Sequence, residues 1–321
     1  MKLLEVKDLK KNIPEAFVLD GISFEIEEKG IYGFFGKRGA GKTLLASLLC
    51  GVCDADSGDI RYKGKSIFAS DKQAAQVKRK IGYVPSQIRF PSDMTVAEVL
   101  DFTGAAKKVS PDKRARQIKE SLNLTGLENK ADILIENLTP SEKKRVAYAN
   151  SLLGNPDVII IDEPIVMIDV QQREEIKKLI SMLGKMKAVL VFCKDPADIE
   201  DMCDNVAIIS EGRLLVFEPA DVITQKLDGN VSALLRVRGK GTDAEKIIEA
   251  LKNIEPITDV RAGSLNAVIF DIKIECSTRD GVSGAVSAVV EELGAEIVSL
   301  KFTDVKIVDL IEALSVQSEE E

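Results

Sequence analysis

The sequence predicts an α/β domain followed by a smaller α+β domain, and this expectation rests on length, charge and hydrophobic pattern. The 321 residues exceed the roughly 100–200 that one domain usually holds. Residues 231–321 contain 10 basic and 17 acidic side chains, whereas the first 230 residues are nearly neutral. Short apolar runs in the first part alternate with helical patterns, as in a parallel sheet covered by helices. We place the boundary in the turn-rich segment 219–230 and expect domains at 1–227 and 228–321.

Composition excludes several classes of function. The chain has no histidine, so catalysis by a Ser-His or Cys-His pair and a histidine-ligated zinc site are ruled out. Its formal net charge of −8 argues against a nucleic-acid partner, which requires a basic face. No apolar run approaches the ~20 residues that span a bilayer, and the N-terminus has no signal-peptide core. Five cysteines suit a reducing compartment. We therefore expect a cytoplasmic or peripheral protein.

The predicted elements of the two domains differ in order. Strands are expected at 2–6, 22–26 and 31–35, then a helix after Gly41 that ends at Gly51, then buried strands at 158–161, 188–193 and 206–209. The second domain reads as strand 231–238, helix 243–254, strands 257–262 and 266–276, helix 281–293, strand 296–302 and helix 305–316. This βαββαβ order predicts a ferredoxin-like module with an extra terminal helix.

The strongest motif is a glycine-rich loop between a predicted strand and a predicted helix. It fits G-x-x-x-x-G-K-[ST] and comprises Gly36, Lys37, Arg38, Gly39, Ala40, Gly41, Lys42 and Thr43. Glycines allow positive φ angles and a close approach of the backbone, whose N–H groups then point at an anion. Lys42 is expected to reach the β- and γ-phosphates of a nucleotide, and the Thr43 hydroxyl to ligate Mg²⁺. The alternative is a glycine-rich turn with a chance lysine.

Two carboxylates follow the apolar run at 158–161. Asp162 and Glu163 come at the carboxyl end of a buried strand, where open α/β sheets bind ligands. We expect Asp162 to orient Mg²⁺ through a water and Glu163 to polarise the attacking water. An acidic turn after a core strand is the plainer interpretation.

With these motifs, residues 1–220 resemble the ATP-binding subunit of ABC transporters. Four further segments occupy the family's signature, Q-loop, D-loop and closing strand-turn, namely 138–147, 81–87, 167–169 and 204–213. The resemblance implies a P-loop NTPase fold of the ABC ATPase type, with a helical subdomain at about 88–150 and with ATP and Mg²⁺ as cofactors. The acidic second domain looks like the C-terminal extension of ATPases that serve ABC-2 type exporters.

Three positions depart from the family pattern. Ser86 stands where the Q-loop glutamine is expected, and Gln87, the residue assigned to Mg²⁺, comes one place later. Lys194 stands at the position of the switch histidine; it can contact a γ-phosphate as a cation but cannot both accept and donate. Phe17 is the nearest candidate to stack on adenine, with core packing as the alternative.

The signature segment departs furthest. The resemblance implies that Thr139 and Ser141 contact the γ-phosphate held by a partner subunit, but Pro140 lacks an N–H and Glu142 carries a negative charge. The same four residues also form a favourable helix start, in which Thr139 caps the helix and Glu142 folds back as a capping box. A cap alone, a weakened phosphate contact and full signature function all remain open.

The resemblance implies a transport ATPase that works as a dimer. One phosphate loop per chain requires a second copy or a related subunit, and ATP-driven closure is expected to drive separate transmembrane permease subunits from the cytoplasmic face of the membrane. The permease contact is expected near 86–95, through Arg89 and Phe90. A catalytically weak, ATP-binding regulatory or partner subunit is the main alternative, and a soluble ABC-type protein acting on ribosomes or DNA is a third.

Overall fold

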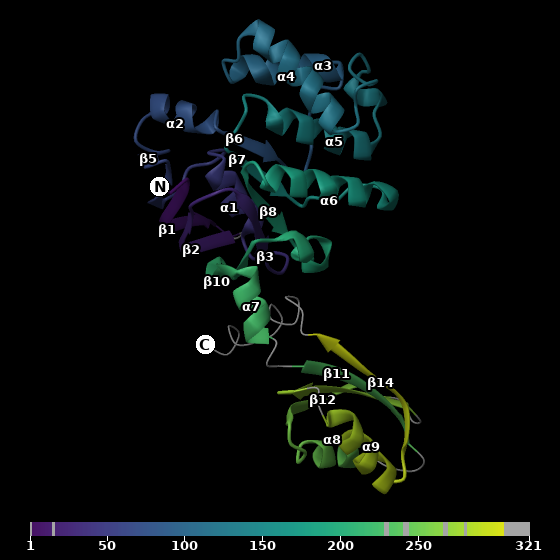
Figure 1. Cartoon of the computed structure of the whole chain (residues 1–321). Coiled ribbons are helices and arrows are strands. Elements are labelled where there is room, and N and C mark those ends of the chain that lie inside the picture. Colours follow the sequence, from purple (N-terminus) through teal and green to yellow (C-terminus); the bar gives the residue numbers. More distant parts are fainter. Residues whose placement is uncertain are drawn as a thin grey trace. The chain divides into compact units, whose positions relative to one another are not determined.

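A computed structural model describes residues 2–14, 17–227, 231–239, 244–265, 269–278 and 281–304 (Figure 1). The described residues separate into two compact units, one ending at Ala220 and one beginning at Asp221. The helix expected at 305–316 lies outside the described residues. Within them, no helix is both long and apolar enough to cross a bilayer.

A six-stranded sheet forms the centre of the first unit, in the order β10-β9-β3-β8-β7-β6. The strands are β3 (Gly30–Phe35), β6 (Ile81–Val84), β7 (Val158–Asp162), β8 (Ala188–Cys193), β9 (Asn205–Ser210) and β10 (Arg213–Pro219). All neighbours pair in parallel except β9 and β10. Every residue of β3, β7 and β8 is buried, which confirms the parallel, doubly covered sheet expected from the apolar runs. The carboxyl ends of its parallel strands consequently meet at one edge.

A second, antiparallel sheet has the order β2-β1-β4-β5. Its strands are β1 (Leu4–Ile13), β2 (Phe17–Ile26), β4 (Ser57–Tyr62) and β5 (Lys65–Ser66). The short strands predicted at 2–6 and 22–26 were wrong in extent, because β1 and β2 pair from Leu4↔Ile26 to Ile13↔Phe17. Main-chain pairing continues there through the polar residues 10–12 of β1 and two register shifts, which a search for apolar alternation does not detect.

Helices cover the six-stranded sheet and extend from it. Helix α1 (Lys42–Leu49) follows β3, α2 (Asp71–Lys78) precedes β6, and α6 (Val170–Gly184) joins β7 to β8. Helices α3 (Val96–Ala106), α4 (Pro111–Leu124) and α5 (Pro140–Leu152) surround a core of their own that includes Leu100, Leu122 and Val146. Figure 1 shows α3 and α4 beyond α5. Short 3-10 turns occupy Ile135–Asn137, Pro196–Asp198 and Glu200–Met202, and α7 (Ala220–Leu227) follows β10.

The second unit is a four-stranded antiparallel sheet with two helices on one face (Figure 1). Its order is β12-β13-β11-β14, built from β11 (Val231–Arg238), α8 (Ala244–Leu251), β12 (Ile257–Leu265), β13 (Ile269–Cys276), α9 (Val282–Glu292) and β14 (Glu296–Asp304). This order confirms the ferredoxin-like βαββαβ module. Helix α8 ends three residues earlier than predicted, because the chain after Leu251 tightens into i→i+3 turns.

Candidate nucleotide-binding site

The glycine-rich loop joins β3 to α1 at the carboxyl edge of the sheet. Gly39 and Gly41 have φ angles of 92° and 97°, a region that side chains other than glycine rarely occupy. The Lys42 side chain, only 6% exposed, crosses the loop and donates from Nζ to the carbonyl oxygens of Gly36 and Lys37 at 2.6 and 3.0 Å. Burial lowers the pKa of Lys42, and the charge of Glu163 opposes this shift. The ammonium is therefore held within the loop whose N–H groups are expected to receive phosphate.

Neighbouring strands constrain this loop closely. A Cβ atom on Gly36 would lie 2.1 Å from the carbonyl oxygen of Ile209 in β9, so only glycine fits there. The N–H of Gly212, in the turn between β9 and β10, donates to the Ala40 carbonyl oxygen at 3.2 Å. Lys37, Arg38, Gly39 and Thr43 are exposed and remain accessible to a ligand.

Asp162 and Glu163 lie at the end of β7, at the same edge as the loop. Asp162 is 0% exposed, and neither carboxylate oxygen has a hydrogen-bond partner. A buried carboxylate without partners is costly, and its two free oxygens are hard ligands of the kind that Mg²⁺ prefers. The described residues contain no group of three or more Cys, Asp and Glu that could hold a metal. The single Asp162 carboxylate nevertheless fits Mg²⁺, because this ion usually takes one or two carboxylates together with substrate phosphates.

Glu163 is half-buried and has a left-handed φ of 53°. Burial raises its pKa, while the positive charge of Lys42 and the main-chain N–H of Lys194 act against that rise. A carboxylate with a raised pKa accepts a proton more readily near neutral pH, which suits a general base.

The signature segment begins α5, and its structure confirms the predicted capping box. The Thr139 hydroxyl accepts from the Glu142 N–H at 3.2 Å, and the Glu142 carboxylate accepts from the Thr139 N–H at 2.9 Å. Glu142 also lies 3.1 Å from Lys130 Nζ, so its charge is partly compensated. The buried Ser141 hydroxyl donates to the side-chain oxygen of Gln172 in α6. Contacts of Thr139 and Ser141 with a nucleotide held by a partner remain predictions.

The remaining predicted site residues lie at the edges of this region. Gln87 is exposed after β6, where its side-chain oxygen accepts from Arg89 at 3.5 Å. Lys194 is exposed directly after β8. Phe17 begins β2, and its side chain lies outside the described residues. The roles assigned to all three stay predictions.

The Cys50-x-x-Cys53 pair ends α1 and carries two free, half-buried thiols. Burial raises the pKa of both thiols, which keeps them protonated and poorly reactive.

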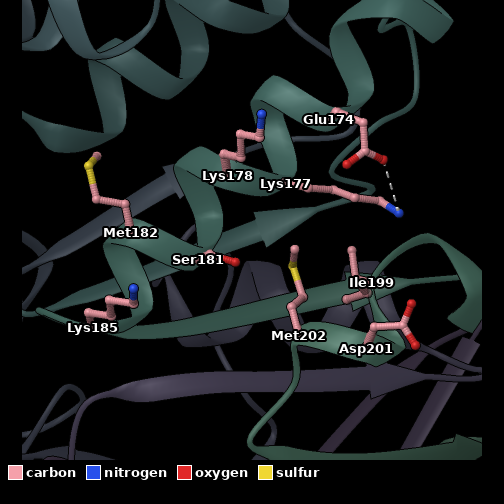
Figure 2. Close-up of a pocket in the computed structure, with 9 residues that line it drawn as sticks. All are labelled: Glu174, Lys177, Lys178, Ser181, Met182, Lys185, Ile199, Asp201 and Met202. Atoms are coloured by element: carbon pink, nitrogen blue, oxygen red, sulfur yellow. Dashed lines mark ion pairs between the residues drawn. The ribbon is translucent and has the colours of Figure 1, made fainter.

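A surface hollow of about 520 Å³ lies apart from these residues, between α6 and the turns after β8 (Figure 2). Apolar side chains of Met182, Ile199 and Met202 line it together with the lysines 177, 178 and 185 of α6. Lys177 is 3.9 Å from Glu174. None of the predicted nucleotide-binding residues contributes to this hollow.

Known proteins similar to this chain are ATP-binding proteins, in agreement with the nucleotide site indicated by the loop and the end of β7. The sequence profile described as "ABC transporter" matches residues 19–166. Nod factor export ATP-binding protein I of Ralstonia nicotianae is 30% identical over 231 residues, which are 71% of either chain. The chain belongs to the ABC transporter ATP-binding subunits. Linearmycin resistance ATP-binding protein LnrL of Bacillus subtilis is 27% identical over 276 residues, covering 86% of this chain and 85% of LnrL.

Solved structures show the same relationship. CbiO1 of Clostridium perfringens, part of the ABC transporter complex cbiONQ, superposes with a TM-score of 0.60 at 26% identity, covering 71% of this chain and 94% of CbiO1. This ABC subunit therefore binds nucleotide and hydrolyses ATP as part of a transporter, and the weakly hydrolysing alternative is not favoured.

The ABC subunit also contains a residue near the site that sequence reasoning missed. Lys144, in α5, is 0% exposed and contacts the ends of both β6 and β7. In the sequence it is one of three consecutive basic residues, Lys143-Lys144-Arg145, a pattern typical of a solvated helix face. No local signal separates it from its neighbours.

Proposed function

We propose that this subunit holds Mg·ATP between the loop Gly36–Thr43 and Asp162, with Glu163 as the residue that polarises the attacking water. The observation that carries the proposal is the buried Asp162 carboxylate, whose two oxygens lack partners at the sheet edge where the loop begins. Bound Mg²⁺ supplies positive charge that stabilises the transferring phosphoryl group. Asp162 would orient that ion through a water, and the Thr43 hydroxyl would ligate it directly.

Lys42 lies where its ammonium can exchange carbonyl acceptors of the loop for phosphate oxygens of a nucleotide. Its ammonium now donates to two main-chain carbonyl oxygens, and charge-assisted bonds to phosphate oxygens are stronger than bonds to neutral carbonyl groups. A triphosphate in the loop would therefore draw Lys42 towards the β- and γ-phosphates. The Lys194 side chain would add a second cation near the γ-phosphate.

Phosphate release by the purified protein tests this assignment. Wild type should hydrolyse ATP, whereas Glu163→Gln should bind ATP with similar affinity and release phosphate at least roughly 100-fold more slowly, the usual order for loss of a general base. Equal release by the two proteins would contradict the role of Glu163.

The subunit is further proposed to act in pairs and to drive export. Two chains, or this chain and a related subunit, would enclose ATP and move separate permease subunits from the cytoplasmic face of the membrane. The name of the Nod factor export protein supports export as the direction. Co-purification with membrane subunits from detergent-solubilised membranes tests this arrangement, and recovery with ribosomes would contradict it.

A groove beside the helical part is the proposed permease contact. Ile88, Arg89 and Phe90 line a hollow of about 330 Å³ between β6, α3 and α5. Phe90→Ala should release the membrane subunits while basal ATP hydrolysis continues. Phe102→Ala is the matched control, because Phe102 is 70% exposed in α3 and does not line the groove. Loss of the membrane subunits from both variants, or from neither, would contradict the assignment.

A further inference from the structure

Lys144 is a fully buried lysine whose contacts converge on the proposed catalytic turn. Lysine is almost never fully buried unless it is paired, yet the Lys144 side chain is 0% exposed. Its Nζ donates to the Pro85 carbonyl oxygen at 3.0 Å and to the Asp162 carbonyl oxygen at 3.2 Å. Pro85 follows β6 and Asp162 ends β7, so one ammonium joins α5 to the carboxyl ends of two neighbouring strands.

The bond to Asp162 acts on the peptide group that carries Glu163. The Asp162 C=O and the Glu163 N–H belong to the same peptide unit, and that N–H donates to the Phe192 carbonyl oxygen of β8 at 2.8 Å. Lys144 therefore holds one side of the unit while β8 holds the other. The unit leads into the left-handed conformation of Glu163, which a residue with a side chain keeps only when its surroundings enforce it.

Helix α5 also supports a second peptide group in this turn, the one that follows Pro164. The buried Tyr148 hydroxyl, one helical turn after Lys144, donates to the Pro164 carbonyl oxygen at 2.8 Å. Residues at i and i+4 lie on one face of a helix, so α5 presents two donors to the turn 162–164. Only the Lys144 donor bonds the peptide unit before Glu163.

We propose that Lys144 is a positioning residue for ATP hydrolysis, which fixes the peptide between Asp162 and Glu163 and thereby aims the Glu163 carboxylate. This inference rests on the proposed role of Glu163. Lys144 itself touches no reacting atom, so its removal should leave nucleotide affinity nearly unchanged and lower kcat. Misplacement of a reacting group by about 1 Å costs roughly 100-fold in rate, and a loss of that order is expected for Lys144→Met.

A matched control is available at the other end of β6. Lys107, the half-buried residue directly after α3, donates from Nζ to the carbonyl oxygens of Ile81 and Leu153 at 3.2 and 2.9 Å. Lys107→Met therefore removes the same kind of interaction at a distance from Glu163. It should leave kcat and the ATP KM near their wild-type values.

The test compares Lys144→Met, Lys144→Gln and Lys107→Met in the full chain. Lys144→Gln keeps a donor without the charge and guards against misfolding of the methionine variant; it should retain more activity than Lys144→Met. The combination Lys144→Met with Glu163→Gln should be no slower than Glu163→Gln alone, because residues that act as a unit are non-additive. A kcat of Lys144→Met within about threefold of wild type, or an equal loss in the Glu163→Gln background, would overturn the proposal.

A second readout needs no nucleotide. In the nucleotide-free protein, amide hydrogen exchange at Glu163 should accelerate about tenfold in Lys144→Met, the factor that corresponds to one lost hydrogen bond, while exchange in Lys107→Met stays at the wild-type rate. Unchanged exchange at Glu163 in Lys144→Met would overturn the proposal. If wild type released no more phosphate than Glu163→Gln, the role of Glu163 would fail, whereas the exchange result would still decide whether Lys144 holds the peptide.

Discussion

Asparagine in place of Asp162 should stabilise the nucleotide-free protein and abolish its stabilisation by Mg·ATP. Each partnerless buried oxygen of the carboxylate costs about 1–3 kcal/mol. Part of this cost is offset, because the Asp162 charge interacts favourably with Lys144 and Lys42 and acts to raise the pKa of each. We therefore expect a net gain of about 1–2 kcal/mol, after allowing for the unpaired amide that asparagine introduces. For a unit of this size the gain corresponds to about 2–8 °C in melting temperature.

With Mg·ATP bound, wild type should become more stable to heat than Asp162→Asn, the reverse of their order without nucleotide. A ligand at 100 times its Kd stabilises the folded state by about 2.7 kcal/mol. Wild type should gain this stabilisation, and Asp162→Asn should not. Thermal unfolding with Mg·ATP, with ATP and EDTA, and without nucleotide measures both effects.

Asp157, just before β7, supplies the control for this experiment. Its carboxylate is paired, because it accepts from the Tyr62 hydroxyl and lies 2.9 Å from Lys63 Nζ. Asp157→Asn should therefore lower the melting temperature and keep the full Mg·ATP shift. Destabilisation of the nucleotide-free protein by Asp162→Asn, as expected for Asp157→Asn, or a wild-type response of Asp162→Asn to Mg·ATP would contradict the role of Asp162.

Two further predictions concern charge. Burial lowers the pKa of Lys107 to about 8 from an ordinary 10.5. Between pH 8 and pH 10.5 the unfolded chain therefore binds one proton more than the folded chain, and the stability of the fold rises with pH. In that window the free energy of unfolding of wild type should rise by up to about 1.4 kcal/mol per pH unit relative to Lys107→Met. Denaturant unfolding of both proteins at pH 8 and pH 10 measures this change. A difference between the two proteins that is the same at both pH values would contradict the prediction. Glu142→Gln removes a negative charge near the expected partner phosphate, so ATP-driven association should tighten by about 1 kcal/mol, or roughly fivefold in Kd. Light scattering that shows unchanged or weaker association would remove the repulsion argument.

Features encoded by short stretches of sequence were predictable. The glycine-rich loop, the end of a buried strand at Asp162 and the capping box of Thr139 and Glu142 all depend on residues within a few positions of one another. The structure confirms the capping box and places Asp162 at the end of β7. The βαββαβ module was likewise predictable, because alternation and helical periodicity are local properties.

Features that depend on distant segments were not predictable. Lys144 is buried because α5 packs on β6 and the lysine side chain reaches the end of β7; its two acceptors lie 59 and 18 residues away in the sequence. The bond from Ser141 to Gln172 spans 31 residues, and it gives the signature hydroxyl a partner in α6 that no motif indicates. The long β1–β2 pairing was missed for a related reason, because its outer part on β1 is polar and the register shifts twice.

Calorimetric titration of the purified protein with Mg·ATP shows whether residues 36–43 bind nucleotide. We expect measurable binding to wild type and a loss of about 10- to 100-fold in affinity for Lys42→Ala, the factor that corresponds to one charged hydrogen-bonding group. The absence of binding heat with wild type, or equal affinity in the two proteins, would contradict the assignment of residues 36–43 as the nucleotide cradle.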